Sequence, residues 1–159
     1  MSSEVELLHI ETGPELEDIR KLFLEYARSL DFSLCFQNFD EELRNLPGEY
    51  APPRGRLILC RYDGSAAGCI ALKPLAGEFC EMKRLFVRPE FRGKHLGVKL
   101  ATYLIEEARQ IGYGAMRLDT IGSMHRAMAL YRSLGFREIA PYYPNPIPNA
   151  VYFELTLDR

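Results

Sequence analysis

The segment 88–97 most constrains what this chain can fold into. It reads Arg-Pro-Glu-Phe-Arg-Gly-Lys-His-Leu-Gly and joins an apolar, strand-like run to a long amphipathic stretch typical of a helix. Backbone N–H groups in the first turn of a helix have no partner within that helix, and the helix dipole favours an anion beside them. Arg92 and Lys94 add two positive charges there. The segment therefore predicts a site for a ligand that carries a phosphate or pyrophosphate group.

Length and composition fit one folded domain over residues 1–159. The chain is 47% hydrophobic and 26% charged, which is ordinary for a globular protein with a sizeable core. Its 20 basic and 22 acidic residues give a net charge of −2, so we expect no nucleic-acid partner. No apolar stretch approaches the roughly 20 residues of a membrane span, and no signal peptide is recognised. We therefore expect no membrane association.

The cysteines and histidines predict neither disulfides nor a metal site. No Cys-x-x-Cys pair occurs, and three of the four cysteines lie in apolar runs, where a thiol acts as a small hydrophobe. Reduced cysteines are typical of a cytoplasmic protein, which is the location we expect. The three histidines are far apart and match no metal-ligand spacing. The cysteines are Cys35, Cys60, Cys69 and Cys80.

The periodicity of apolar residues predicts a mixed α/β fold. Apolar positions three and four apart predict helices over residues 15–30 and 96–111, the second ended by Gly112 and Gly114. Shorter helices are expected over 40–46, capped by Asp40, and up to Leu134, capped by Ser123 or Gly122. Strands are expected over 5–10, 56–62, 66–72, 80–87, 115–120, 136–140 and 150–157. This order favours antiparallel neighbours in the first half and a strand–helix–strand crossover in the second.

Two motifs in this order resemble the GNAT superfamily of acyl-CoA-dependent N-acyltransferases. Arg92-Gly93-Lys94-His95-Leu96-Gly97 is similar to its Gln/Arg-x-x-Gly-x-Gly/Ala signature, preceded by Leu85-Phe86-Val87-Arg88-Pro89. Residues 127–136, Ala-Met-Ala-Leu-Tyr-Arg-Ser-Leu-Gly-Phe, are similar to a second common segment. The resemblance implies a central, mostly antiparallel, twisted sheet splayed between strands 4 and 5 and flanked by helices. It also implies acetyl-CoA as co-substrate, with its pyrophosphate held by residues 92–97 and no metal.

Two positions depart from the superfamily pattern. His95 occupies the place of the first glycine of the signature. A histidine can keep helical dihedrals there and still offer its N–H, but its side chain must then swing clear of the phosphate site or join it. Met124 stands where an asparagine is often seen, seven residues before Tyr131, so one polar contact to the cofactor arm or the substrate is expected to be absent.

A primary amine that attacks a thioester must first lose a proton, because an alkyl ammonium has a pKa near ~10.4. Glu81 is the candidate general base, and Glu78, in the preceding turn, is the second choice. Period-two alternation would place Glu81 on one strand face with Lys83, Leu85 and Val87. The alternative for either glutamate is a solvated carboxylate at a strand end.

The leaving thiolate needs only mild acid help, which a tyrosine hydroxyl can provide. The resemblance places Tyr131 beside the sulfur, against the alternative of an ordinary core tyrosine. It also implies that a backbone amide within Leu85-Phe86-Val87 stabilises the developing oxyanion. Cys80 has no histidine near it in the sequence, and a structural thiol is the simpler interpretation.

Aromatic residues at two places are expected to rim the acceptor site, or simply to pack a lid. These are Phe32 in the first half of the chain and Tyr142 and Tyr143 in the proline-rich loop. The predicted function is acetyl transfer from acetyl-CoA to a primary amine of a small molecule or amino acid. The alternative is a catalytically weak acyl-CoA-binding sensor. A homodimer is left open.

Overall fold

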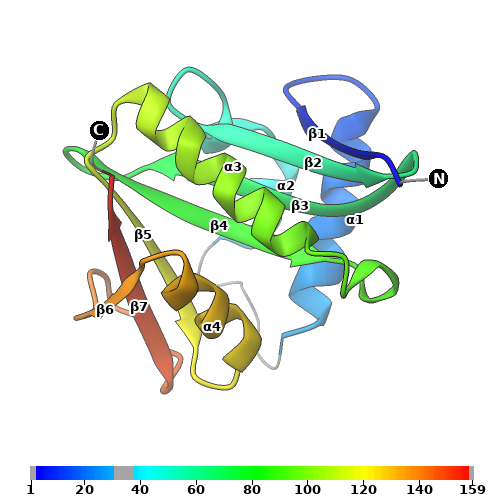
Figure 1. Ribbon diagram of the computed structural model, residues 1–159. Coiled ribbons are helices and arrows are strands. Elements are labelled where there is room, and N and C mark those ends of the chain that lie inside the picture. Colours follow the sequence, from blue (N-terminus) through cyan, green and yellow to red (C-terminus); the bar gives the residue numbers. More distant parts are fainter. Residues whose placement is uncertain (1–2, 31–37, 158–159) are drawn as a thin grey trace.

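The computed structural model describes residues 3–30 and 38–157, and within them seven strands form one twisted sheet (Figure 1). The strand order is β1-β2-β3-β4-β5-β7-β6. Only the β4–β5 pair is parallel; the other neighbours are antiparallel. The strands are β1 (Val5–His9), β2 (Arg56–Tyr62), β3 (Ser65–Pro74), β4 (Phe79–Val87), β5 (Ala115–Ile121), β6 (Arg137–Ile139) and β7 (Ala150–Thr156).

The helices follow the predicted order. They are α1 (Glu15–Arg28), α2 (Phe39–Arg44), α3 (Leu96–Ile111) and α4 (His125–Ser133), with 3-10 turns η2 (Gly48–Tyr50) and η3 (Pro89–Phe91). The bounds of α3 agree with the prediction, because Gly112 takes a left-handed φ of 109° and ends the helix. No helix within 3–30 and 38–157 is long and apolar enough to cross a membrane.

Helices cover both faces of the sheet, so the core has two parts (Figure 1). On one face α3 crosses β2, β3 and β4, and its buried Leu100 and Leu104 pack in the same cluster as Tyr131 of α4. On the other face lie α1 and α2, with Phe23 and Phe39 in the cluster. Cys60, Cys69 and Cys80 are buried, as predicted, and form no disulfide within the described residues, whereas Cys35 lies outside them.

Strands β4 and β5 separate soon after they meet. They pair only over residues 79–81 and 115–117, after which β4 continues along β3 and β5 continues along β7. Figure 1 shows the two halves of the sheet diverging from this point. The predicted splay between strands 4 and 5 is therefore confirmed, and it opens a gap beside the second half of each strand.

A β-bulge changes the direction of side chains in the second half of β4. Ala71 pairs with Lys83 but Cys69 pairs with Phe86, so β4 carries one extra residue, and Arg84 takes a left-handed φ of 61°. As a result Leu85 and Val87 pack on the α3 side of the sheet. The predicted shared face of Glu81, Lys83, Leu85 and Val87 is therefore wrong beyond Lys83, because an inserted residue inverts the alternation.

Two predicted helix caps are also wrong. Helix α2 begins at Phe39 after Asn38, whose left-handed φ of 56° turns the chain into the helix, so Asp40 lies in the first turn. Helix α4 begins at His125 after Met124, and not directly after Ser123 or Gly122. The Met124 N–H donates to the Ile121 carbonyl at 2.9 Å, and this turn moves the helix start along the chain.

Candidate active site

Two residues in the turn before α3 have a left-handed backbone conformation. Gly93 has φ 82° and His95 has φ 62°. His95 does not take the helical dihedrals that a histidine could adopt here: it precedes the helix, in a conformation that favours glycine. The Lys99 N–H donates to the His95 carbonyl at 3.1 Å, so the amides of the three residues between them start α3 without a helical acceptor.

These amides lie at one side of a groove between the first turns of α3 and α4, which we name the α3–α4 groove. Six of the predicted cofactor residues line it: Val87, Arg92, Gly93, His95, Leu96 and Gly97. A Cβ built on Gly97 would meet nothing closer than Leu130 Cδ2 at 3.9 Å, so the backbone is open to a ligand there. Lys94 is placed elsewhere, with its ammonium 5.1 Å from the Tyr62 ring centre. Arg92 and the helix amides fit a diphosphate.

The gap between β4 and β5 holds a second hollow of about 130 Å³, the inner cavity. Leu85 and Lys83 line it from β4, Asp119 from β5 and Tyr131 from α4. Met124 and Ala127 line both this cavity and the α3–α4 groove, so the two hollows adjoin. A long ligand held at the start of α3 would therefore point its far end at Tyr131.

Tyr131 is only 8% exposed, and its ring packs against Phe136 and Phe153 at centroid distances of 5.8 and 6.1 Å. Burial raises the pKa of its hydroxyl above the ordinary value. Among the described residues the hydroxyl has no hydrogen-bond partner. Tyr131 thus presents a protonated hydroxyl to the inner cavity.

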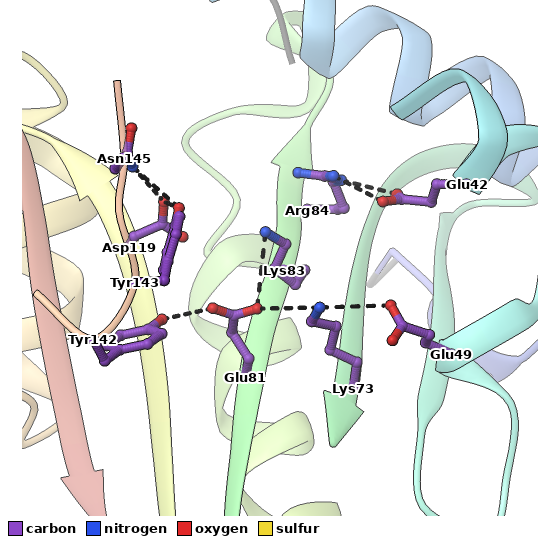
Figure 2. A network of polar contacts seen from close by, with 10 residues as sticks. All are labelled: Glu42, Glu49, Lys73, Glu81, Lys83, Arg84, Asp119, Tyr142, Tyr143 and Asn145. Carbon is purple, nitrogen blue, oxygen red and sulfur yellow. Dashed lines mark hydrogen bonds and ion pairs between the residues drawn. The ribbon is translucent and has the colours of Figure 1, made fainter. Parts of the chain in front are cut away.

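Glu81 lies in a third hollow, the polar cavity, which Lys73, Tyr142 and Tyr143 also line (Figure 2). It is 3% exposed. The Tyr142 hydroxyl donates to Glu81 Oε2 at 2.6 Å, and the Lys73 and Lys83 ammoniums lie 3.9 and 3.8 Å from Oε1. Burial, followed by the Glu81 charge, raises the pKa of Tyr142. Glu81 is therefore a buried carboxylate at a cavity wall and not a solvated strand end.

Side chains of the loop before β7 form hydrogen bonds to both diverging strands, β4 and β5 (Figure 2). While Tyr142 reaches Glu81 on β4, the Tyr143 hydroxyl donates to Asp119 Oδ2 on β5 at 2.5 Å. Burial, then the Asp119 charge, raises the pKa of Tyr143. The loop thus forms one wall of the polar cavity, and both predicted tyrosines are anchored by carboxylates.

Lys83 and Arg84 line both the inner and the polar cavity. The Arg84 guanidinium is fixed by two bonds to Glu42 of α2, from Nε at 3.0 Å and from Nη2 at 2.8 Å. Shared wall residues therefore place the α3–α4 groove, the inner cavity and the polar cavity next to one another as a series, from the start of α3 to Glu81.

Several predicted residues lie away from this series of hollows. Phe32 lies outside the described residues. Phe86 is buried on the α1 side against the Tyr26 ring, so only its backbone could reach a ligand. Glu78 is exposed in the turn before β4, and its carboxylate lies where a Cβ on Gly114 would be.

Sequence reasoning missed Lys73, Arg84 and Asn145, which donates to Asp119 at 3.4 Å. A signal was present for the first two. Lys73 is the one charged residue of the largely apolar strand 65–74, and Arg84 is one of three in the strand 79–87. A charge in a largely buried strand needs a partner or a ligand.

The sheet split between β4 and β5 and the groove at the start of α3 agree with the acyltransferase fold that the sequence resemblance implies. The acetyltransferase (GNAT) family model matches residues 16–136. The chain belongs to this family, and it is an acyltransferase. The family match confirms the resemblance to the GNAT superfamily that the two sequence motifs indicated.

Individual relatives agree with the family match. An uncharacterized N-acetyltransferase of Schizosaccharomyces pombe is 42% identical over 159 residues, covering 99% of this chain and 98% of that protein. A GNAT-family acetyltransferase structure from Staphylococcus aureus has a TM-score of 0.79 at 21% identity and covers 98% of this chain and 100% of that chain. A Salmonella typhimurium structure that contains its cofactor acetyl-CoA has a TM-score of 0.70 at 19% identity, covering 97% and 94%.

Proposed function

We propose that the enzyme transfers the acetyl group of acetyl-CoA to a primary amine of a small molecule or amino acid, without a covalent enzyme intermediate. The adjoining hollows support this reaction. The α3–α4 groove is open at the helix amides, the inner cavity contains the Tyr131 hydroxyl, and the polar cavity contains Glu81. Two substrates can therefore approach one another from opposite sides of the split sheet.

The chain's own groups would hold the cofactor in two places. The amides of Leu96 and Gly97 and the guanidinium of Arg92 would bind the diphosphate. Met124 and Ala127 would contact the arm where the groove meets the inner cavity. Acetyl-CoA supplies the activated acyl group, and these contacts would direct it into the gap between β4 and β5.

Glu81 would take the proton from the acceptor ammonium, directly or through one water. Its carboxylate is held in place by the Tyr142 hydroxyl and flanked by two ammonium groups. Tyr142 and Tyr143 would form the aromatic wall on which the acceptor lies.

The remaining groups would act on the thioester. The β-bulge turns the backbone after Arg84 out of the regular ladder, and an amide within 85–87 would stabilise the oxyanion that forms on the carbonyl oxygen. The Tyr131 hydroxyl would donate a hydrogen bond or a proton to the sulfur as coenzyme A leaves.

The observation that carries the proposal is that Tyr131 lines the inner cavity next to the α3–α4 groove. Two measurements test it. Acetyl-CoA should raise the melting temperature by mass action, since a ligand bound only by the folded state stabilises it. Release of free thiol across a panel of amines should then identify the acceptor. Tight binding with no turnover on any amine would contradict the enzyme mechanism and favour a sensor.

A further inference from the structure

Lys83 lies in the wall shared by the inner cavity and the polar cavity. Its side chain is 9% exposed. Figure 2 shows it projecting from β4 into the gap between the diverging strands, with Asp119 of β5 across from it. Under the proposed function the thioester occupies the inner cavity and the acceptor amine arrives through the polar cavity. A primary amine of the protein itself therefore lies between the two substrates.

The surroundings of Lys83 increase the share of its neutral amine, which is the nucleophilic form. Burial lowers the pKa of Lys83 below its ordinary value, and the nearby Glu81 carboxylate only partly opposes this. Charged and titratable groups from every surrounding element face Lys83 or share its cavities. They are Glu81 and Arg84 on β4, Lys73 on β3, Asp119 on β5, Tyr26 on α1, Glu42 on α2, Glu49 and Tyr50 on η2, Tyr131 on α4, and Tyr142 and Tyr143 on the loop before β7.

We propose that Lys83 is an acetylation site, modified by acetyl-CoA bound in the same chain when no acceptor amine is present. This inference rests on the proposed function. The Lys83 nitrogen attacks the thioester carbonyl carbon, a nitrogen–carbon bond forms and the carbon–sulfur bond breaks. The proton lost from nitrogen passes to Glu81 and then to the departing thiolate, so coenzyme A leaves as its thiol. No other reactant is needed.

Acetylation of Lys83 would slow the enzyme. Acetylation removes the positive charge of a lysine, so the ion pair with Glu81 is lost, and the added acetyl group narrows the passage between the two cavities. An amide does not readily give up its acyl group to another amine, so the product is a modified enzyme. Turnover of an added amine should fall as modification accumulates, and an acceptor present from the start should protect Lys83.

The first test is intact-mass and peptide mass spectrometry of the wild-type enzyme incubated with acetyl-CoA and no amine. One acetyl group per chain is expected, on Lys83. Lys73 is an internal control, since it lies 3.9 Å from the same Glu81 oxygen but lines only the polar cavity of the two. Lys21, Lys94 and Lys99 complete the lysines of the chain. Lys83→Arg should abolish the modification; if this variant does not fold, the wild-type peptide map still decides.

The rate of modification should not depend on protein concentration, because the reaction occurs within one chain. Acetyl groups spread over Lys21, Lys73 and Lys99, or none at all, would overturn the proposal, as would a rate that rises with protein concentration. Thiol release with an added amine but no acetyl on Lys83 would overturn this inference alone. No melting shift with acetyl-CoA and no thiol release would instead overturn the proposed function.

A second readout needs no cofactor. Reductive methylation with ¹³C-formaldehyde allows each lysine to be titrated by NMR in the apo enzyme. Lys83 should lose its proton at a lower pH than Lys21 and Lys99, which lie in α1 and α3. A midpoint at or above theirs would remove the reason for its nucleophilicity.

Discussion

Replacing Tyr131 with phenylalanine removes one oxygen from the inner cavity and leaves the ring in place. The ring contacts with Phe136 and Phe153 remain. Within the described part of the chain the hydroxyl donates to no protein group, so the variant loses no internal hydrogen bond. We therefore expect its free energy of unfolding to stay within about 1 kcal/mol of wild type.

The effect on catalysis should be much larger. A positioned proton donor accelerates a reaction about 10²- to 10⁴-fold. A thiolate is a good leaving group, because the pKa of a thiol is only ~8.5, so we expect an acceleration near the lower end of that range. We therefore expect kcat to fall about 100-fold, equivalent to ~2.7 kcal/mol of transition-state stabilisation. Because burial raises the pKa of Tyr131, its hydroxyl stays protonated in alkaline buffers, so it should impose no loss of wild-type rate up to about pH 10.

Thiol release at saturating acetyl-CoA, with the acceptor varied, gives kcat and KM separately. Tyr103→Phe is the matched control: Tyr103 lies in α3 beside His9, its hydroxyl 2.6 Å from His9 Nε2, and lines none of the three hollows described above. Its kcat should be unchanged. A wild-type kcat in Tyr131→Phe, with the fold intact, would refute the argument that the hydroxyl assists the leaving group.

Three further outcomes are expected. Glu81→Gln should lower the rate about 100-fold at neutral pH and less at alkaline pH, where more of the acceptor amine is already neutral. The rate of the control variant Glu78→Gln should match wild type. A loss of rate in Glu81→Gln that does not vary with pH would indicate that Glu81 has a role other than a base. His95→Gly should raise the melting temperature by about 1–4 °C, because glycine relieves roughly 1 kcal/mol of left-handed strain, whereas His95→Ala should not; calorimetry measures both. The pKa values of Tyr142 and Tyr143 are raised above 10 in the folded state, so above pH 10 the unfolded chain loses these protons first and stability should fall. Urea denaturation measures this fall, and a denaturation midpoint that stays constant up to pH 11 would contradict it.

The sequence predicted the elements that obey a simple period. Helix α3 has its apolar stripe at helical spacing and a glycine directly after it, and its bounds agree with the structure. The splay of the sheet came from the family resemblance, because three paired positions between β4 and β5 leave no mark on the pattern of apolar residues.

The site was only partly predictable. Glu81 was chosen by its position in a strand and its residue type, and Tyr131 by the family resemblance; the structure places each at a cavity wall. The β-bulge at Arg84 could not be foreseen, because arginine has no particular tendency toward a left-handed φ, and one extra residue moved Leu85 and Val87 to the other face. The links from Tyr142 and Tyr143 to the two strands join residues far apart in the chain, and sequence spacing carries no such information.

The short β4–β5 pairing makes that end of the sheet a pivot. Beyond Glu81, β4 extends six further residues to Val87, a lever of about 20 Å at ~3.3 Å per residue. A rotation of roughly 5° between the two halves would shift the far ends by about 1.7 Å, and misplacement of that order is enough to cost an enzyme much of its rate. The packing of Cys80 against Met116 in this paired stretch, next to Glu81, therefore influences how far apart β4 and β5 lie beside the proposed reaction site.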